Sequence, residues 1–211
     1  MYSGITRGLF DVIHVDKQTG LTKYIVKLND ELIDGVEIGA SINIDGVCQS
    51  VIHINHNEVT FQAIAETLQR TTLNDLYVGR KVSVEKSLCY GDVIGGHEIA
   101  GHVIGTATVK EIHPSENNLT LVLQCPKEWL KCIFIKGFIA VDGSSLTVGE
   151  INRNESTFKI HLIPETIRVT NFGNKKVGDK VNIELDFKTQ AIVQTVERIL
   201  HENNLLTLAQ A

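Results

Sequence analysis

The chain has few cysteines that could form disulfide bonds, and it lacks long apolar segments that could cross a membrane. Its 211 residues include only four cysteines, which form no CxxC pair. This pattern argues against a disulfide framework and favours a reduced, cytoplasmic setting. No segment approaches the roughly 18 consecutive apolar residues of a membrane span. The first residues also lack the basic flank and apolar run of a signal peptide, so we expect neither export nor membrane insertion.

Clusters of positive charge are also missing. The formal net charge is −5, and no group of lysines and arginines forms a basic patch. A nucleic-acid partner is therefore not expected, because such partners are recognised through concentrated positive charge. The 43% hydrophobic and 21% charged residues are typical of a soluble globular protein, and the composition favours a small-molecule ligand.

An internal duplication is the most informative feature that is present. Residues 45–51, DGVCQSV, return as residues 142–148, DGSSLTV. Glu66-Thr67 returns as Glu165-Thr166 in a register shifted by two residues, which predicts an insertion in a turn near Asn152 to Thr157. The unit is too long for a solenoid repeat. We therefore predict two domains, residues 1–96 and 97–188, followed by a tail of residues 189–211.

Strand signals dominate both copies. Apolar residues alternate with mostly polar ones, as in residues 42–44, 82–84, 119–123 and 181–185. The Asp-Gly pairs in each copy suit tight hairpin turns. This pattern predicts an all-β protein with one small antiparallel barrel per copy. Short helices are expected at the barrel ends, in residues 28–33, 66–73 and 126–132.

The tail differs from the rest of the chain. It has the helical spacing of an apolar stripe, formed by Ile192, Val193, Val196, Ile199 and Leu200. A lone helix of this length is marginal in water, so the stripe needs a partner surface. That partner is either the chain's own barrel or other copies of the chain. We favour the oligomer, since the tail lies outside the duplicated unit.

Positions at which the two copies differ are candidates for chemistry. At five equivalent positions, one copy has a titratable residue and the other does not. The aligned pairs are Cys48 and Ser145, Ile5 and His102, Gly39 and Lys136, Gln62 and His161, and Ser87 and Asp186. Two pockets of similar shape but unlike proton chemistry suit an enzyme that uses two molecules of one compound in different roles. Binding alone does not require this asymmetry.

Six segments of the chain form a combined pattern: Tyr2-Ser3-Gly4-Ile5, Asp45-Gly46-Val47-Cys48, Gly95-Gly96-His97-Glu98-Ile99-Ala100-Gly101-His102, Lys136-Gly137-Phe138-Ile139-Ala140-Val141-Asp142-Gly143, Ser145-Leu146-Thr147-Val148 and Leu162-Ile163-Pro164-Glu165-Thr166. Each segment alone is weak, but their order, spacing and duplication make a specific signal over residues 1 to about 200. Together they resemble riboflavin synthase of the two-barrel type. The chain departs from the usual family pattern at Gln49, Ser50, Gln62 and Ala100.

The resemblance implies a fold and a reaction. The fold is a tandem pair of six-stranded antiparallel Greek-key β-barrels with a C-terminal α-helix. The reaction is a dismutation in which one 6,7-dimethyl-8-ribityllumazine gives a four-carbon unit to a second, yielding riboflavin and 5-amino-6-(D-ribitylamino)uracil without a metal or redox cofactor. The resemblance also implies a homotrimer joined through the helices, with the active site between barrels of neighbouring subunits, and association with lumazine synthase.

The resemblance assigns substrate contacts by position. Lumazine contacts are expected from Gly4, Ile5, Thr6, Cys48, Gln49, Ser50, Gln62, Ala63, Ile64, Ala65, Glu66, Thr67, Gly101, His102 and Val103, and the partner pocket from Lys136, Ser145, Leu146, Thr147, His161, Leu162, Ile163, Pro164, Glu165 and Thr166. Thr67 and Thr166 suit a ribityl chain, because a hydroxyl both donates and accepts, but threonine also caps helices.

The reaction requires loss of a proton from the C7 methyl group of one lumazine and addition of a nucleophile to C7 of the other. His102 is the candidate base, because histidine exchanges protons near neutral pH. Cys48 or Ser145 could supply or orient the nucleophile, although Cys48 could equally be an inert pocket wall. The spacing of His97 and His102 without an acidic or cysteine partner is poor for zinc, and His97 is interpreted as structural.

Two further charged residues complete the predicted catalytic set. Asp186 is expected to orient Ser145 or His102, and otherwise to be a solvated surface carboxylate. Lys136 is expected to place positive charge near the anion that forms on the ring, and otherwise to be an ordinary surface lysine. The main competing function is a non-catalytic antenna protein that binds lumazine or flavin, and a purely structural all-β interaction protein is a third.

Overall fold

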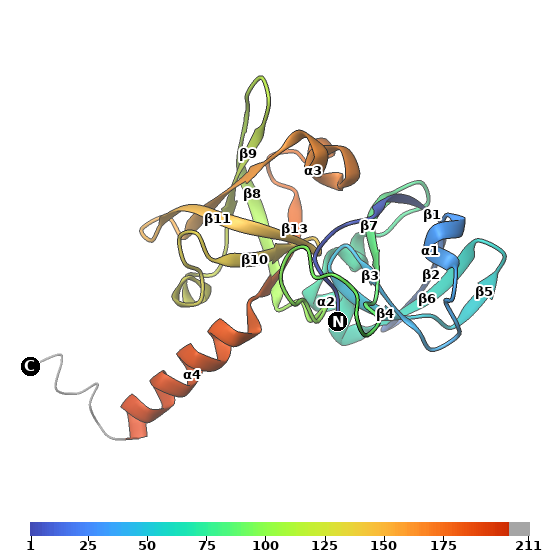
Figure 1. The fold of residues 1–211 in the computed structure, drawn as a ribbon, viewed down its shortest axis with the longest axis horizontal. Coiled ribbons are helices and arrows are strands. Elements are labelled where there is room, and N and C mark those ends of the chain that lie inside the picture. The colour runs from blue at the N-terminus through green and yellow to red at the C-terminus, as the bar shows by residue number, and fades with distance from the viewer. Residues whose placement is uncertain (203–211) are drawn as a thin grey trace, which may run out of the picture.

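Two β-domains lie side by side and a long helix leaves the second of them (Figure 1). The computed structural model describes residues 1–202. The first domain contains β1 (Gly8–Gln18), β2 (Leu21–Lys27), β3 (Ser41–Ile44), β4 (Val47–Ser50), β5 (His53–Asn55), β6 (Glu58–Ile64) and β7 (Lys81–Lys86). The second contains β8 (Gly105–Pro114), β9 (Leu119–Gln124), β10 (Phe138–Val141), β11 (Ser144–Asn152), β12 (Thr157–Leu162) and β13 (Lys180–Leu185).

The second domain is a closed barrel of six strands in the order β10-β11-β12-β9-β8-β13, all antiparallel. The first has seven strands in the order β4-β3-β7-β1-β2-β6-β5. The all-β fold and the tandem repeat are thus confirmed, but the first copy has one strand more than six.

The extra strand comes from a break in one long strand. In the second barrel, β11 pairs with both β10 and β12 and shifts register between Val148 and Ile151. In the first domain, the equivalent segment is divided at Val51 and Ile52 into β4 and β5. The Ile52 N–H still donates to the Thr60 carbonyl at 3.0 Å. The break therefore occupies the place of a bulge, where a barrel strand bends from one partner to the next.

Turns and short helices follow the repeat. The β3–β4 and β10–β11 hairpins turn at Asp45-Gly46 and Asp142-Gly143, all with positive φ, as expected for Asp-Gly turns. The insertion lies in the β11–β12 turn. The helices are α1 (Asp30–Ile33), α2 (Ala65–Arg70), η1 (Thr72–Asp75), η2 (Lys127–Lys131), α3 (Pro164–Val169), η3 (Asn171–Asn174) and α4 (Phe187–Glu202). Those within residues 28–33, 66–73 and 126–132 were expected, whereas α3 and η3 were not.

Each domain has its own core. Tyr24 and Phe61 stack inside the first, with ring centroids 5.4 Å apart, while Phe158 and Phe172 are fully buried in the second. Separate cores are expected of modules of about a hundred residues, since this size buries enough apolar surface for independent folding.

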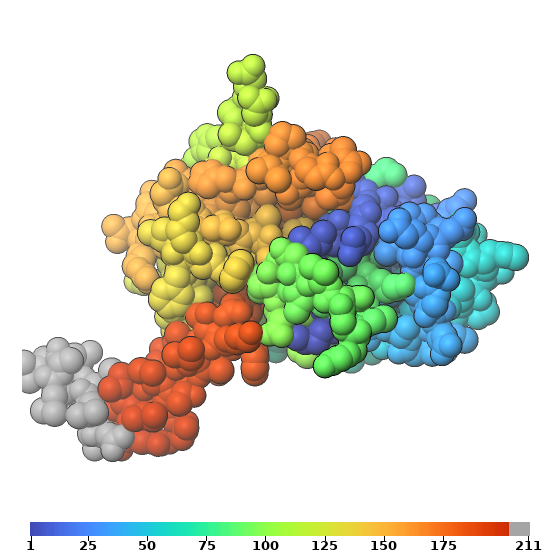
Figure 2. All heavy atoms as spheres, in the orientation of Figure 1, coloured from blue at the N-terminus to red at the C-terminus, as the bar shows by residue number. Residues whose placement is uncertain are grey.

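Helix α4 extends away from the barrels (Figures 1 and 2). Val193 packs against the second core, but the side chains of Ile192 and Val196 are 65% and 49% exposed. The predicted apolar stripe therefore meets its own barrel at one position and faces solvent at others. Within residues 1–202, no helix is long and apolar enough to span a membrane.

Candidate functional site

The segment before each barrel crosses to the other barrel. Residues 2–6 precede the first barrel, yet the Ser145 N–H donates to the Gly4 carbonyl at 2.9 Å. Residues 99–103 precede the second barrel, and the Cys48 N–H donates to the Gly101 carbonyl at the same distance. The Tyr2 and Ile99 backbones join the two segments through a pair of hydrogen bonds. The repeats are thus interlocked at their candidate sites.

A buried glutamate holds each crossing segment. Glu85 accepts hydrogen bonds from the Ser3 N–H at 2.7 Å and the Gly4 N–H at 3.0 Å. At the equivalent place, Glu184 accepts from the N–H groups of residues 100, 101 and 102 at 2.7–2.9 Å. Burial raises the pKa of both carboxyls, and the N–H donors oppose this shift. The backbone of both sites is therefore fixed by the same device.

The first site lies at the end of the first barrel. A cavity of about 280 Å³ is lined by Val47, Cys48, Glu66, Thr67, Arg70, Thr71, Gly101, His102 and Val103. Six of these lining residues were predicted from the sequence, the exceptions being Val47, Arg70 and Thr71. Cys48 is half-buried, and its Sγ accepts a hydrogen bond from the Tyr2 hydroxyl at 3.2 Å. His102 is exposed at the rim, with its backbone fixed by Glu184.

The second site is built around Ser145. Gly4 lies so close that a Cβ on it would come within 2.5 Å of the Ser145 Cβ. Thr6 and Ser144 share a hydrogen bond between their hydroxyls at 2.9 Å. Residues 4–6 were grouped with the first barrel's contacts in the prediction from the sequence. In the structure they lie against the second barrel, because the segment that contains them crosses to it.

His97 joins the second site, although the sequence indicated only a structural role. Its Nδ1 lies 2.6 Å from the Ser145 Oγ, and its ring stacks on Phe138 with centroids 5.0 Å apart. Burial lowers the pKa of His97, and Asp186 opposes that change. The neighbouring Gly96 permits this approach, because a Cβ there would come within 2.7 Å of the Ser145 Oγ.

Asp186 does not hydrogen-bond Ser145 or His102 in the described part of the chain. Its carboxylate accepts from the Thr189 N–H at 2.7 Å and so caps α4. It also lines a larger cavity of about 900 Å³ with Met1, Ile94, Gly96, His97, Glu98, Ala100, His102, Phe138, Phe187 and Lys188. Asp186 is therefore partly exposed and lines the same cavity as His97 and His102, and its expected role in orienting Ser145 or His102 stays a prediction.

The remaining predicted contacts fall into two groups. Gln49, Ala63 and Leu162 are buried, and Gln49 accepts from the Tyr24 hydroxyl at 3.0 Å, so these residues support the sites from the core side. The others are at least partly exposed near the barrel ends: Ile5, Ser50, Gln62, Ile64, Ala65, Lys136, Leu146, Thr147, His161, Ile163, Pro164, Glu165 and Thr166.

Three of the exposed residues have defined local settings. Lys136 has a positive φ of 64° and is held by its N–H bond to the Val148 carbonyl. The His161 Nδ1 lies 2.8 Å from the Thr120 Oγ1. Thr166 does not cap a helix through its side chain. Helix α3, which contains Thr166, has no side-chain cap, whereas Thr71 and Thr170 cap the following helices η1 and η3 through their Oγ1 atoms.

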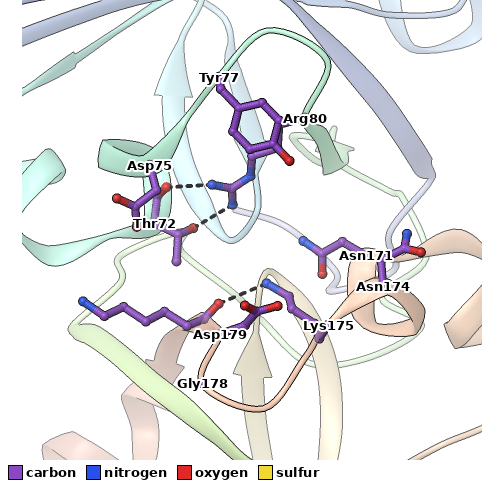
Figure 3. A pocket seen from close by; sticks show the side chains of 10 residues that line it. Thr72, Asp75, Tyr77, Arg80, Asn171, Asn174, Lys175, Gly178 and Asp179 are labelled. Carbon is purple, nitrogen blue, oxygen red and sulfur yellow. Dashed lines mark hydrogen bonds between the residues drawn. The ribbon is translucent and has the colours of Figure 1, made fainter.

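A third cavity, of about 430 Å³, lies between the barrels on the side of η1 and η3 (Figure 3). Its two inner cations neutralise buried aspartates of the hairpin turns. Arg80 pairs with Asp45 at 2.9 Å and Lys175 pairs with Asp142 at 2.8 Å. Asn182 bridges the barrels by donating to the Asp45 carbonyl at 2.7 Å. These groups serve the barrel interface, and residues 1–202 contain no cluster of three or more metal-ligand side chains.

The fold and the two exchanged sites define a protein with tandem lumazine-binding barrels. Two stretches, residues 3–87 and 100–186, match the family described as Lumazine binding domain. The chain is 44% identical to riboflavin synthase of Escherichia coli (strain K12) over 95% of this chain and 93% of the relative. It is 34% identical to riboflavin synthase of Bacillus subtilis (strain 168), over 97% and 92%.

A solved structure, LumP complexed with riboflavin, superposes with a TM-score of 0.82 at 25% identity, covering 88% of this chain and 100% of that one. A second, LumP complexed with 6,7-dimethyl-8-(1'-D-ribityl) lumazine, has a TM-score of 0.79. The chain belongs to the riboflavin synthase family of lumazine-binding proteins.

Proposed function

We propose that this chain is a riboflavin synthase, which converts two molecules of 6,7-dimethyl-8-ribityllumazine to riboflavin and 5-amino-6-(D-ribitylamino)uracil. The observation that carries the proposal is the pair of equivalent sites with unlike side chains. Cys48 and Ser145 occupy the same turn position in the two barrels, and each is held by the crossing segment of the other repeat. The family membership over nearly the whole chain supports the same activity.

The two sites suit donor and acceptor roles that differ in proton chemistry. The first combines a thiol at Cys48 with the imidazole of His102, which suits removal of a proton from the C7 methyl group. The second presents the Ser145 hydroxyl, and Lys136 lies two residues before its strand β10, where its charge stabilises a ring anion. Thr67 and Thr166 lie at equivalent places in the first turns of α2 and α3, neither of which has a side-chain cap, and their hydroxyls suit the ribityl hydroxyls of the substrate.

The active unit is a homotrimer, in which the first site of one subunit faces the second site of its neighbour. The exposed apolar side chains of α4 at Ile192 and Val196 support this assembly, since they lie outside both cores. Free thiols at all four cysteines suit the cytoplasm. Association with lumazine synthase stays a prediction.

The test is incubation of the purified chain with the lumazine as sole substrate. Riboflavin formation, followed by its fluorescence, and release of the aminouracil in equal amount are expected. The antenna function predicts a bound, unchanged chromophore instead. A binding function alone draws support from the likeness to LumP, which was solved with riboflavin and with a lumazine, but the identity there is 25%, against 44% to a synthase.

A further inference from the structure

The Ser145 hydroxyl has one short, directional partner. The His97 Nδ1 lies 2.6 Å from Oγ, while the Ser145 backbone is fixed by the Gly4 carbonyl. Gly96 closes a third side, since a Cβ added to this glycine would lie 2.4 Å from the Ser145 Cβ. The side chain is therefore confined by three neighbours, and among residues 1–202 the His97 bond sets the direction of its proton.

His97 is itself held in one orientation. It is 7% exposed, and its ring is stacked nearly parallel to Phe138 at an interplanar angle of 17°. A ring so placed keeps Nδ1 pointed at Ser145 without needing a second hydrogen bond.

We propose that His97 is a positioning residue for Ser145: its neutral ring accepts the Ser145 hydroxyl proton at Nδ1, so that the Oγ lone pairs face the second site as acceptors. The proposal rests on the proposed function of that site. A neutral imidazole offers one acceptor nitrogen, whereas the protonated ring has only donors. Protonation of His97 therefore reverses the bond, and Ser145 then presents its O–H to the site as a donor.

The surroundings favour the neutral ring at physiological pH. Burial lowers the pKa of His97. Of the charged groups around it, Asp186 opposes this effect, while Glu98 and Lys188 line the same cavity and pair with each other at 2.7 Å. His102 and the amino group of Met1 complete the cavity's titratable lining.

The first site has the opposite arrangement. There the partner of the equivalent residue is the Tyr2 hydroxyl, which donates to the Cys48 Sγ. Burial raises the pKa of Tyr2, so this group stays a donor. The two turn residues are therefore supplied with partners of opposite polarity, a donor at Cys48 and an acceptor at Ser145. This difference adds to the asymmetry of the two sites.

The protonation state can be tested without turnover. In the full-length chain with ¹⁵N-labelled histidine, NMR at neutral pH is expected to show His97 unprotonated at Nδ1 and protonated at Nε2, with a pKa below the ordinary value. Ser145→Ala is expected to change the Nδ1 shift, and His113→Gln, at an exposed position near the end of β8, is expected to leave it unchanged. A proton on Nδ1 at neutral pH would overturn the proposal.

Kinetics test whether the bond matters for the reaction. His97→Gln keeps an acceptor oxygen without a titrating ring, whereas His97→Phe keeps the stacking and removes the acceptor. His97→Phe is expected to lower kcat about tenfold or more, because the Ser145 hydroxyl loses its partner and its fixed direction. Ser145→Ala is expected to lower kcat to a similar extent, because it removes the hydroxyl itself. The double variant is expected to be no slower than Ser145→Ala alone, since the pair acts as a unit.

His97→Gln provides the outcome that a merely structural role would not give. It is expected to recover most of the loss in His97→Phe and to abolish the fall of kcat at acid pH that His97 protonation causes. Additive losses in the double variant, or an unchanged acid limb in His97→Gln, would refute the positioning role. Absence of riboflavin formation by the unmodified chain would refute the synthase function instead, and the NMR result would stand by itself.

Discussion

The contact between Gly101 and Cys48 gives the sharpest structural prediction. Gly101 has a φ of +80°, and a Cβ added to it would lie 2.6 Å from the Cys48 Cβ and 2.8 Å from the Cys48 nitrogen. A Gly101→Ala change therefore carries two costs. The left-handed backbone costs a non-glycine residue about 1–2 kcal/mol, and overpacking against a fixed strand costs about 1–3 kcal/mol more.

Gly79 provides a matched control, because it isolates the first of these costs. Its φ is +92°, and an added Cβ would meet no atom within 4 Å. Gly79→Ala is thus expected to lose only the backbone contribution. The unfolding midpoint of Gly101→Ala is expected to lie roughly 2–12 °C below that of Gly79→Ala, since 1 kcal/mol shifts the midpoint by about 2–4 °C at this size.

The assay combines thermal unfolding with a lumazine titration. Gly101→Ala is expected to weaken lumazine binding as well, because relief of the clash moves Cys48 or the crossing segment within the first cavity. Gly79→Ala is expected to bind normally. Equal midpoints and equal affinities for the two variants would show that the crossing segment does not press on the Cys48 turn, and the interlocked geometry would then be wrong.

Three further outcomes are expected. His102→Gln and Cys48→Ser, assayed side by side, are expected to lower kcat by about tenfold or more in the first and less in the second, and near-normal rates in both would remove these residues from catalysis. The full chain is expected to have the mass of a trimer in solution and a chain truncated before Gln190 a smaller one, and an unchanged oligomeric state would exclude α4 from assembly. Burial and the charge of Asp142 raise the pKa of Asp45 from 3.8 to about 6, so the folded chain binds the proton more tightly than the unfolded chain. The free energy of unfolding is therefore expected to decrease as pH rises between about 4 and 6, and Asp45→Asn is expected to reduce that slope.

The duplication made most of the fold predictable. Alternating apolar residues and the Asp-Gly turns at residues 45–46 and 142–143 predicted paired antiparallel barrels, because both signals are local. The division of one strand at Val51 was not predictable, since it depends on how a single bulge relaxes in each copy. Helices α3 and η3 were missed although their counterparts in the first copy were expected, so the repeat itself contained the missing signal.

The sequence predicted many of the residues that line the sites, but not which barrel each of them lies against. Lining residues of the first cavity such as Thr67 and Val103 were identified from the family pattern. The assignment of Gly4 to the second barrel could not be read from the sequence, because it depends on a segment crossing between domains. The partner of Ser145 was missed for the same reason, since His97 lies before the second barrel and reaches Ser145 only through tertiary packing.

The crossing segments explain why the duplicated sites could diverge without losing their common shape. Glu85 accepts from two backbone N–H groups and the Ser3 hydroxyl, and Glu184 accepts from three backbone N–H groups, so both glutamates fix the course of each segment mainly through its backbone. Side chains at the turn positions are then free to differ, with Cys48 in one site and Ser145 in the other. Because each site takes its segment from the other repeat, neither site is complete in one half of the chain. An isolated first half would lack Gly101 and His102, and the asymmetry that the reaction needs is therefore a property of the fused pair.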